Sequence, residues 1–456
     1  MTDFRRDTLG RTTKILLDSG KAASVDEATA LLHDFTLQVD VQVGGPLDLT
    51  AQAALLTAVN TGVRAFKGGV HVRVKQESPL QLPWARGLSI SDAVGAFGGA
   101  TVPQLKSGLP TLIIGATTPE STFDDALYLT WAGWVGAAVS NYGERLSGDG
   151  IVLSGVAAAA LGVAELFQRE LGSPIAGRRS VGLSLWDPGS DWRTTGSHGE
   201  DLTFLPASLW LLGLGHLGQA YAWSLGCLPY PVAHQPHIWL VDTDIFVDAN
   251  LDTGLLTDGD SCGHLKTRVV DRRLSDLGFV TSIVERLYDE TLVADPKEPG
   301  IALAGFDKPE PRRVVEESFQ YIVDAGLGHG PFDYLDILVH TFPGNEPAAI
   351  AFPDSEPSVA RALPAAYEHA VGDAIGRGDN EADARCGVVD VHGASVGAAF
   401  VGSLAGALVV ADVLRMLHGG PELSVVNVDL ADPENVNSVS VRVARTIVNF
   451  GFIDTE

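Results

Sequence analysis

The stretch LWLLGLGHLGQAYAWSLG, at residues 209–226, places a glycine turn between an apolar run and an amphipathic segment. Gly213, Gly215 and Gly218 have the spacing G-x-G-x-x-G. This order predicts a buried β-strand, a tight turn and a helix whose N-terminal N–H groups face a phosphate. It therefore favours an α/β fold with a parallel sheet in this part of the chain. Taken alone, the glycine spacing also fits a plain tight βα turn.

A carboxylate after the next predicted strand favours nucleotide binding over a plain turn. The residues HIWLVDTD, at 237–244, form that strand. Asp242 follows Gly218 at roughly the 20-residue offset at which a carboxylate meets a ribose hydroxyl. On these residues alone the usual expectation is NAD.

The N-terminal half of the chain repeats this order of elements. The residues FTLQVDVQVGG (35–45) and GGVHVRVK (68–75) predict two strands around a helix, and each half ends in an Ala/Gly/Val-rich helix. We therefore expect an α/β protein with two Rossmann-like units. The first turn of the N-terminal unit contains Pro46 and lacks the third glycine, which predicts a degenerate unit without a phosphate site.

A chain of 456 residues is too long for one ordinary core. The stretch 173–205 is rich in Gly, Ser, Pro and Asp, and is the predicted linker. We therefore expect an N-terminal domain at 1–172 and a C-terminal domain at 206–456.

Charge and cysteine content exclude several classes of function. The formal net charge of -26 argues against nucleic acid and anionic membranes as partners. The longest apolar runs are broken by glycine, which predicts buried helices and no membrane span. None of the three cysteines forms a C-x-x-C pair, so a cysteine-rich zinc site is excluded. The polar first residues lack a signal-peptide pattern, and we expect a cytoplasmic protein.

The residues that follow Asp242 resemble the ThiF/MoeB and ubiquitin-activating enzyme superfamily. In that superfamily a strand ends in Asp-x-Asp, followed by Asn-Leu and later by a glycine and a lysine. The pattern falls on Asp242, Asp244, Asn250, Leu251, Gly263 and Lys266. The resemblance continues through AGFDKPEPRRVVEE (304–317), YIVDAGLGHG (321–330) and the stretch 385–417. It covers about residues 200–420, whereas the N-terminal half resembles an inactive adenylation half only in architecture. The resemblance therefore implies an inactive adenylation-like domain at 1–172 and an active adenylation domain with a crossover loop at 206–456.

The resemblance implies ATP-dependent adenylation of the C-terminal glycine of a ubiquitin-like or sulfur-carrier protein, with Mg²⁺. It also implies a conjugating-enzyme-like acceptor, a monomeric pseudo-dimer or homodimer, and a place in bacterial ubiquitination-like or antiphage defence operons. Lys266 and Asp307 would be catalytic, with Asp307 as the magnesium ligand, and Cys386 would carry a thioester. The implied nucleotide-binding residues are Gly213, Gly215, Gly218, Asp242, Asp244, Asn250 and Lys266.

The sequence departs from the superfamily at one phosphate-facing position. The Arg-Gln pair after Asn-Leu is replaced by Thr253-Gly254, so one cation is missing. Arg11 and Arg64 are the candidate replacements from the other half of the chain.

Several candidate residues have a structural alternative. Lys266 fits a solvated helix face, and Asp307 fits a helix N-cap. Cys386 fits a buried core position, with Cys262 as a weaker rival nucleophile and Cys227 as core. We expect His216 to face solvent from the glycine turn.

Two other functions stay open at this level. A nicotinamide-dependent oxidoreductase leaves Asn250, Lys266 and Asp307 unexplained. A catalytically degenerate scaffold that binds a partner is favoured by Thr253.

Overall fold

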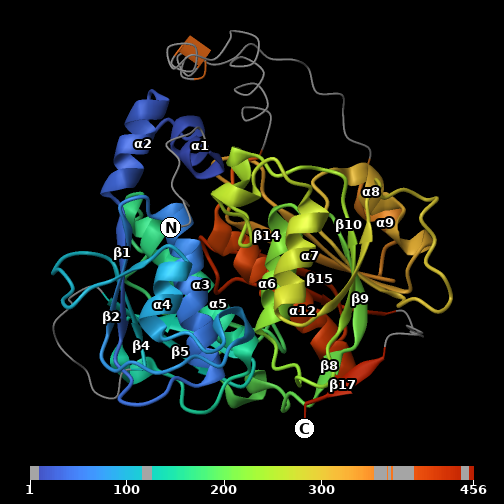
Figure 1. The fold of residues 1–456 in the computed structure, drawn as a ribbon, viewed down its shortest axis with the longest axis horizontal. Helices are drawn as coiled ribbons and strands as arrows, with labels where there is room; N and C mark the ends of the chain where they lie inside the picture. The colour runs from blue at the N-terminus through green and yellow to red at the C-terminus, as the bar shows by residue number, and fades with distance from the viewer. Residues whose placement is uncertain are drawn as a thin grey trace.

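The computed structural model describes residues 10–115, 126–353, 367, 371–372, 395–442 and 451–455. These residues form two mixed β-sheets of seven and eight strands, with helices between and around them (Figure 1). The predicted α/β class with two sheet-based units is thereby confirmed. The degenerate character of the N-terminal unit stays a prediction.

The first sheet has the strand order β3-β2-β1-β4-β5-β6-β7. Neighbours from β3 to β5 are parallel, whereas β6 and β7 are antiparallel to their neighbours. The strands are β1 (Thr36–Val41), β2 (Gly69–Val74), β3 (Ala100–Thr101), β4 (Thr111–Ile114), β5 (Ala126–Ala132), β6 (Val135–Val139) and β7 (Val181–Ser184). Since β7 lies within 173–205, part of the predicted linker is an edge strand of this sheet.

The second sheet repeats this plan with the order β11-β10-β9-β12-β13-β14-β15-β16. Neighbours from β11 to β13 are parallel, and the later pairs are antiparallel. The strands are β9 (Ser208–Leu212), β10 (His237–Val241), β11 (Val280–Val284), β12 (Ile301–Ala304), β13 (Tyr321–Leu327), β14 (Asp336–Phe342), β15 (Leu423–Asp429) and β16 (Asn437–Ser440). In both sheets the strand order reverses beside the first strand, which is where doubly wound folds bind ligands.

The remaining elements connect and cover the sheets. A small sheet pairs β8 (Phe204–Pro206) with β17 (Phe452–Asp454). The α-helices are α1 (Arg11–Asp18), α2 (Val25–Asp34), α3 (Leu49–Ala65), α4 (Ile90–Ala96), α5 (Val152–Glu170), α6 (His216–Cys227), α7 (Lys266–Asp276), α8 (Pro309–Arg313), α9 (Ala348–Ala351) and α12 (Ala399–Leu417). The 3₁₀ turns are η1 (Pro83–Ala85), η2 (Tyr142–Glu144), η3 (Thr195–His198), η4 (Asp248–Asn250), η5 (Gly259–Ser261) and η6 (Val315–Glu317).

Helices α3, α5, α6 and α12 fill the space between the two sheets (Figure 1). Glycines allow this close packing: a Cβ on Gly406 of α12 would lie 2.5 Å from the carbonyl oxygen of Ala220 in α6. By length and composition alone, α5 and α12 could span a membrane. Since 94% and 89% of their apolar windows are buried inside the protein, both are core helices, as the sequence predicts.

Aromatic residues join the two units. Trp84 of η1 stacks on Trp223 of α6 with ring centroids 5.1 Å apart, and its indole N–H donates to the carbonyl of Trp223. Trp134, Trp210 and Trp223 are buried, and Trp131 and Trp239 are partly buried. Cys227 is a core residue whose burial raises the pKa of its thiol.

Candidate active site

A cavity of about 280 Å³ lies at the carboxyl ends of β9, β10, β12 and β13. This is the point at which the strand order of the second sheet reverses, because β10 and β12 lie on opposite sides of β9. The predicted site residues that line the cavity are Gly213, Gly215, Asp242, Asp244, Asn250, Lys266 and Asp307. The segments that carry these residues are spread over positions 213–307 of the sequence and meet at this cavity.

The glycine turn forms one wall of the cavity. Gly213 has a φ of +80°, which a residue with a side chain adopts only with strain, and Gly215 is the N-cap of α6. Gly218 does not line the cavity. A Cβ at Gly218 would overlap the carbonyl oxygen of Gly213, so this glycine lets α6 pack against the turn.

The two aspartates after β10 have different partners. Asp242 accepts hydrogen bonds from the backbone N–H of Leu214, at 2.6 Å, and of Asp244, at 2.8 Å. Asp244 forms a 2.7 Å ion pair with Lys266, the first residue of α7. The Lys266 side chain is only 11% exposed, so it is not the solvated surface residue of the alternative interpretation.

Asn250 and Asp307 reach the cavity from two other segments. Asn250 ends η4, and its Oδ1 accepts the backbone N–H of Val247 at 3.0 Å. Asp307 is exposed and follows β12. The N-cap position of α8 belongs to Lys308, and no side chain caps this helix, so the N-cap interpretation of Asp307 is wrong.

Only one of the two predicted replacement arginines reaches the cavity. Arg11, at the start of α1, lines it, and its Nη1 lies 3.5 Å from Ser395 Oγ. Burial lowers the pKa of Arg11, while Asp307 and Asp252 act in the opposite direction. Its Nε is buried without a hydrogen-bond partner among the described residues. A buried donor without a partner is costly.

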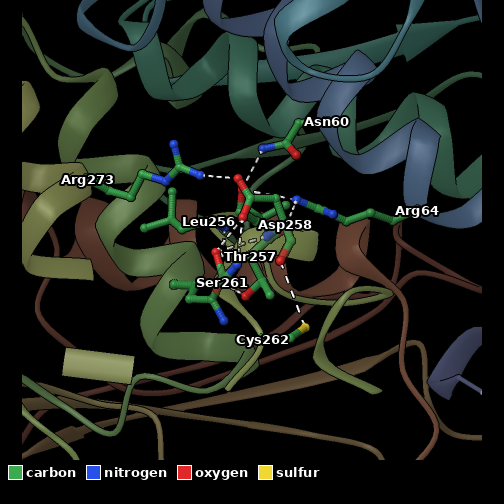
Figure 2. A network of polar contacts seen from close by, with 10 residues as sticks. Asn60, Arg64, Leu256, Thr257, Asp258, Ser261, Cys262 and Arg273 are labelled. Atoms are coloured by element: carbon green, nitrogen blue, oxygen red, sulfur yellow. Dashed lines mark hydrogen bonds and ion pairs between the residues drawn. The ribbon is translucent and has the colours of Figure 1, made fainter. Parts of the chain in front are cut away.

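Arg64 instead binds backbone between the two units. Its guanidinium donates to the carbonyls of Leu251 and Thr257, at 3.0 and 3.1 Å. Figure 2 shows Arg64 and Asn60 of α3 directed at the loop that contains these carbonyls. On the other side of the loop, Arg273 of α7 pairs with Asp258. Complete burial lowers the pKa of Arg64 to about 10. Arg64 thus stabilises the loop and is not a cation of the cavity.

No charged side chain occupies the position of the superfamily arginine, which is Thr253 in this chain. Thr253 is 1% exposed and does not line the cavity. A Cβ on Gly254 would crowd the side chains of Thr257 and Gln219, at 2.5 and 2.6 Å. The backbone at this position is therefore packed in the interior.

The cavity carries an excess of positive charge in an acidic protein. Its carboxylates belong to Asp242, Asp244 and Asp307, and its cations are Arg11, Lys266, Arg286, Lys308 and Arg312. Sequence reasoning did not name Arg286, Lys308 or Arg312. Lys308 and Arg286 both lie shortly after the carboxyl end of a parallel strand, β12 and β11 respectively. Because ligands bind at these strand ends, their positions in the sequence were a usable signal for both residues. Arg312 pairs with the fully buried Asp324.

His216 does not face open solvent as expected, because it is half-buried and lines the cavity. Its ring Nε2 is buried and has no hydrogen-bond partner among the described residues. The ring lies so close to Gly402 of α12 that a Cβ there would overlap Nε2. Burial, with Arg11 nearby, lowers the pKa of His216 to about 3, so the imidazole is neutral near pH 7.

The predicted thioester cysteine, Cys386, lies outside the described residues. The rival Cys262 is partly exposed, with its Sγ 3.9 Å from the carbonyl oxygen of Asp258 (Figure 2). It does not line the cavity.

Comparisons with known proteins identify the family to which this chain belongs. Residues 36–185 match the model of the BilD N-terminal domain, and residues 205–420 match that of the BilD C-terminal domain. The bacterial E1-like protein BilD of Collimonas sp. (strain OK412) is 37% identical over 417 residues, which span 91% of this chain and 89% of that protein. This chain belongs to the BilD family of E1-like proteins. The membership confirms the predicted superfamily.

Solved structures resemble the BilD-family chain only distantly. A crystal structure of E. coli MccB with ATP is 13% identical, with a TM-score of 0.34, over 71% of this chain and 98% of that one. A structure of PaaA is 13% identical, with a TM-score of 0.34, over 52% of this chain and 64% of that one. Likenesses at this level do not bear on the site.

Proposed function

We propose that this BilD-family chain uses ATP to adenylate the C-terminal glycine of a ubiquitin-like or sulfur-carrier protein. One observation carries the proposal. The cavity at the reversal of the second sheet gathers the glycine turn, Asp242, Asn250, Lys266 and Asp307, which the superfamily pattern assigns to this chemistry. The E1-like family membership supports the same substrate class.

The charge of the cavity suits a reaction between two anions. The C-terminal carboxylate of the partner attacks the α-phosphorus of ATP, the acyl adenylate forms, and pyrophosphate leaves. Catalysis then depends mainly on positioning and on neutralising negative charge. The turn and the start of α6 offer backbone N–H groups to phosphates, and Lys266 and Arg11 add positive charge.

Two aromatic side chains give the same cavity an apolar wall that suits the flat purine base of a nucleotide. Tyr288 and Phe306 both line it, with ring centroids 5.4 Å apart and planes 26° apart. Aromatic side chains of this kind pack well against a purine ring. Asp242 keeps lone pairs for a ribose hydroxyl beyond its two backbone hydrogen bonds.

Asp307 fits the role of a magnesium ligand. Magnesium in nucleotide sites is bound by one or two carboxylates and the substrate phosphates, and it helps to neutralise phosphate charge. Among the described residues no group of three or more His, Cys, Asp or Glu side chains could hold a metal ion. The exposed Asp307 carboxylate at the cavity matches a metal that is held largely by the nucleotide.

The first prediction concerns the nucleotide. Calorimetry is expected to show binding of ATP with Mg²⁺ and weaker or no binding of NAD. In Gly215→Asp, a carboxylate enters open space beside the cavity and is expected to abolish ATP binding by repelling phosphate. Tighter binding of NAD than of ATP would contradict the proposed function and favour an oxidoreductase.

The second prediction concerns a covalent step at Cys386. We infer that the thiolate attacks the acyl adenylate, so that a thioester forms and AMP leaves. With a ubiquitin-like protein that ends in glycine, the wild type is expected to form an adduct that dithiothreitol cleaves. Cys386→Ala should lose this adduct yet keep pyrophosphate exchange. Cys262→Ala is the matched control and should keep both, and an adduct lost only in Cys262→Ala would refute the assignment.

A further inference from the structure

Asp252 lies where three parts of the molecule meet. It follows Asn250 and Leu251 in the loop after β10, and its side chain is 8% exposed. One carboxylate oxygen contacts the start of α1, and the other contacts Lys67, which follows α3 of the N-terminal unit. A single side chain of the C-terminal unit therefore contacts both the N-terminal helix and the N-terminal unit.

Asp252 caps a helix that lies 240 residues away in sequence. The N-cap residue of α1 is Gly10, which has no side chain to bind the first N–H groups. The backbone N–H of Thr12, the second residue of α1, donates to Asp252 Oδ2 at 3.1 Å. The positive end of the helix dipole favours a carboxylate there. A Cβ on Gly10 would overlap this carboxylate, so the contact requires glycine.

The same carboxylate is fixed from the side of α3. Lys67 Nζ lies 2.6 Å from Asp252 Oδ1, and each side chain of the pair is 8% exposed. Arg64 donates to the carbonyl of Leu251, and Asn60 donates to that of Leu255, both at 3.0 Å. The loop is thus attached to the N-terminal unit on both sides of Asp252.

Arg11 is the residue whose position depends on this cap. It directly precedes Thr12, so the contact that holds the Thr12 N–H also fixes the backbone from which Arg11 enters the cavity. Among the described residues, its guanidinium Nη1 contacts Ser395 Oγ at 3.5 Å, and its Nε has no hydrogen-bond partner. The position of α1 therefore sets the point from which the Arg11 side chain enters the cavity.

We infer that Asp252 is a positioning residue that holds α1, and through it Arg11, against the cavity. The inference rests on the proposed function only in taking the cavity as a site for nucleotide phosphates. The N-terminal unit then takes part in catalysis without binding nucleotide, because Lys67 orients the carboxylate that caps α1. The position next to Asp252, Thr253, is where the superfamily has its own phosphate-facing arginine.

Hydrogen exchange on the nucleotide-free protein tests the contact directly. Gly10→Ala leaves Asp252, Lys67 and Arg11 in place but pushes the start of α1 away, so amide exchange over residues 11–18 is expected to accelerate. Asp252→Asn combined with Lys67→Met keeps a capping oxygen without leaving a buried lysine unpaired, so it should stay close to wild type, whereas Asp252→Ala should not. Gly44→Ala is the control, because no atom lies within 4 Å of its added Cβ and its φ is not positive.

A double-mutant cycle tests the route through Arg11. In ATP–pyrophosphate exchange, Gly10→Ala and Asp252→Ala are each expected to lower kcat by roughly 10- to 100-fold, the cost of a small misplacement of a catalytic group. In an Arg11→Ala background neither change should lower kcat further. Because Asp252→Ala leaves Lys67 buried without its partner, the double change Asp252→Ala with Lys67→Met keeps the test usable if the single variant unfolds.

The outcomes separate this inference from the proposed function. Unchanged exchange of α1 in both Gly10→Ala and Asp252→Ala refutes the contact, whether or not the protein binds ATP. Additive losses of kcat in the Arg11→Ala background show a merely structural Asp252 and also overturn the inference. Failure of the wild type to bind ATP, together with faster exchange of α1 in the variants, refutes the proposed function and leaves the capping role in place.

Discussion

In Lys266→Ala, ATP–pyrophosphate exchange is expected to lose about 2–4 kcal/mol of transition-state stabilisation, which is roughly a 30- to 1,000-fold loss of rate. The lysine begins α7, its side chain is nearly buried, and its ammonium lies 2.7 Å from Asp244 in the wall of the cavity. A charge held there before the reaction needs no reorganisation as negative charge develops on the phosphates. Steady-state exchange at saturating ATP measures the loss.

Two further variants serve as comparisons for Lys266→Ala. Lys297→Ala removes an exposed lysine that does not line the cavity and should leave the rate unchanged. Asp244→Asn leaves the ammonium in place but weakens its ion pair, so it should cost less than Lys266→Ala. A Lys266→Ala rate within about twofold of wild type would show that the lysine carries no phosphate charge and would favour a scaffold role for this chain.

Local sequence patterns predicted segments that the structure brings together at one wall of the cavity. The glycine turn, Asp242 and Lys266 each lie at the end of a strand or the start of a helix, and parallel strands bring such ends to one edge. Hydrophobic periodicity also gave the two sheets and the core position of α5 and α12. These features depend on residues close to each other in the chain.

The features that sequence reasoning missed depend on contacts between distant segments. Arg11 and Arg64 were equivalent candidates, and only the packing of α1 against the loop at Asp252 separates them. His216 follows a glycine at the start of a helix, where side chains commonly face solvent or a ligand. Here Gly402 makes room for its ring beside α12, so a small residue of a distant helix determines its position.

The missing superfamily arginine bears on the choice between an enzyme and a degenerate scaffold. Thr253 is buried and cannot contribute charge, which on sequence alone favoured a scaffold. The structure supplies Arg11 to the same cavity from a helix that no local pattern linked to it. The cavity therefore receives a cation from α1, although the loop at Thr253 offers none.

The second large effect is expected at Asp307. Asp307→Asn should lower Mg²⁺-dependent pyrophosphate exchange by about 100-fold or more while the thermal midpoint stays near that of wild type. A neutral amide keeps the size of the carboxylate but is a much poorer ligand for a hard cation such as Mg²⁺. Because Asp307 is exposed and caps no helix, the substitution removes no contact on which folding depends.

Titration with Mg²⁺ distinguishes the metal role from other roles of this carboxylate. The variant should need a higher Mg²⁺ concentration for half-maximal ATP binding by calorimetry, and added Mg²⁺ should restore part of the binding. Glu310→Gln is the matched control, since it removes an exposed carboxylate of α8 that does not line the cavity. If Asp307→Asn instead lowers exchange with an unchanged Mg²⁺ requirement, the carboxylate acts on Arg11, whose pKa it raises, and not on a metal ion. Full activity in Asp307→Asn would remove it from the catalytic residues altogether, because asparagine keeps the shape of the side chain and loses only its charge.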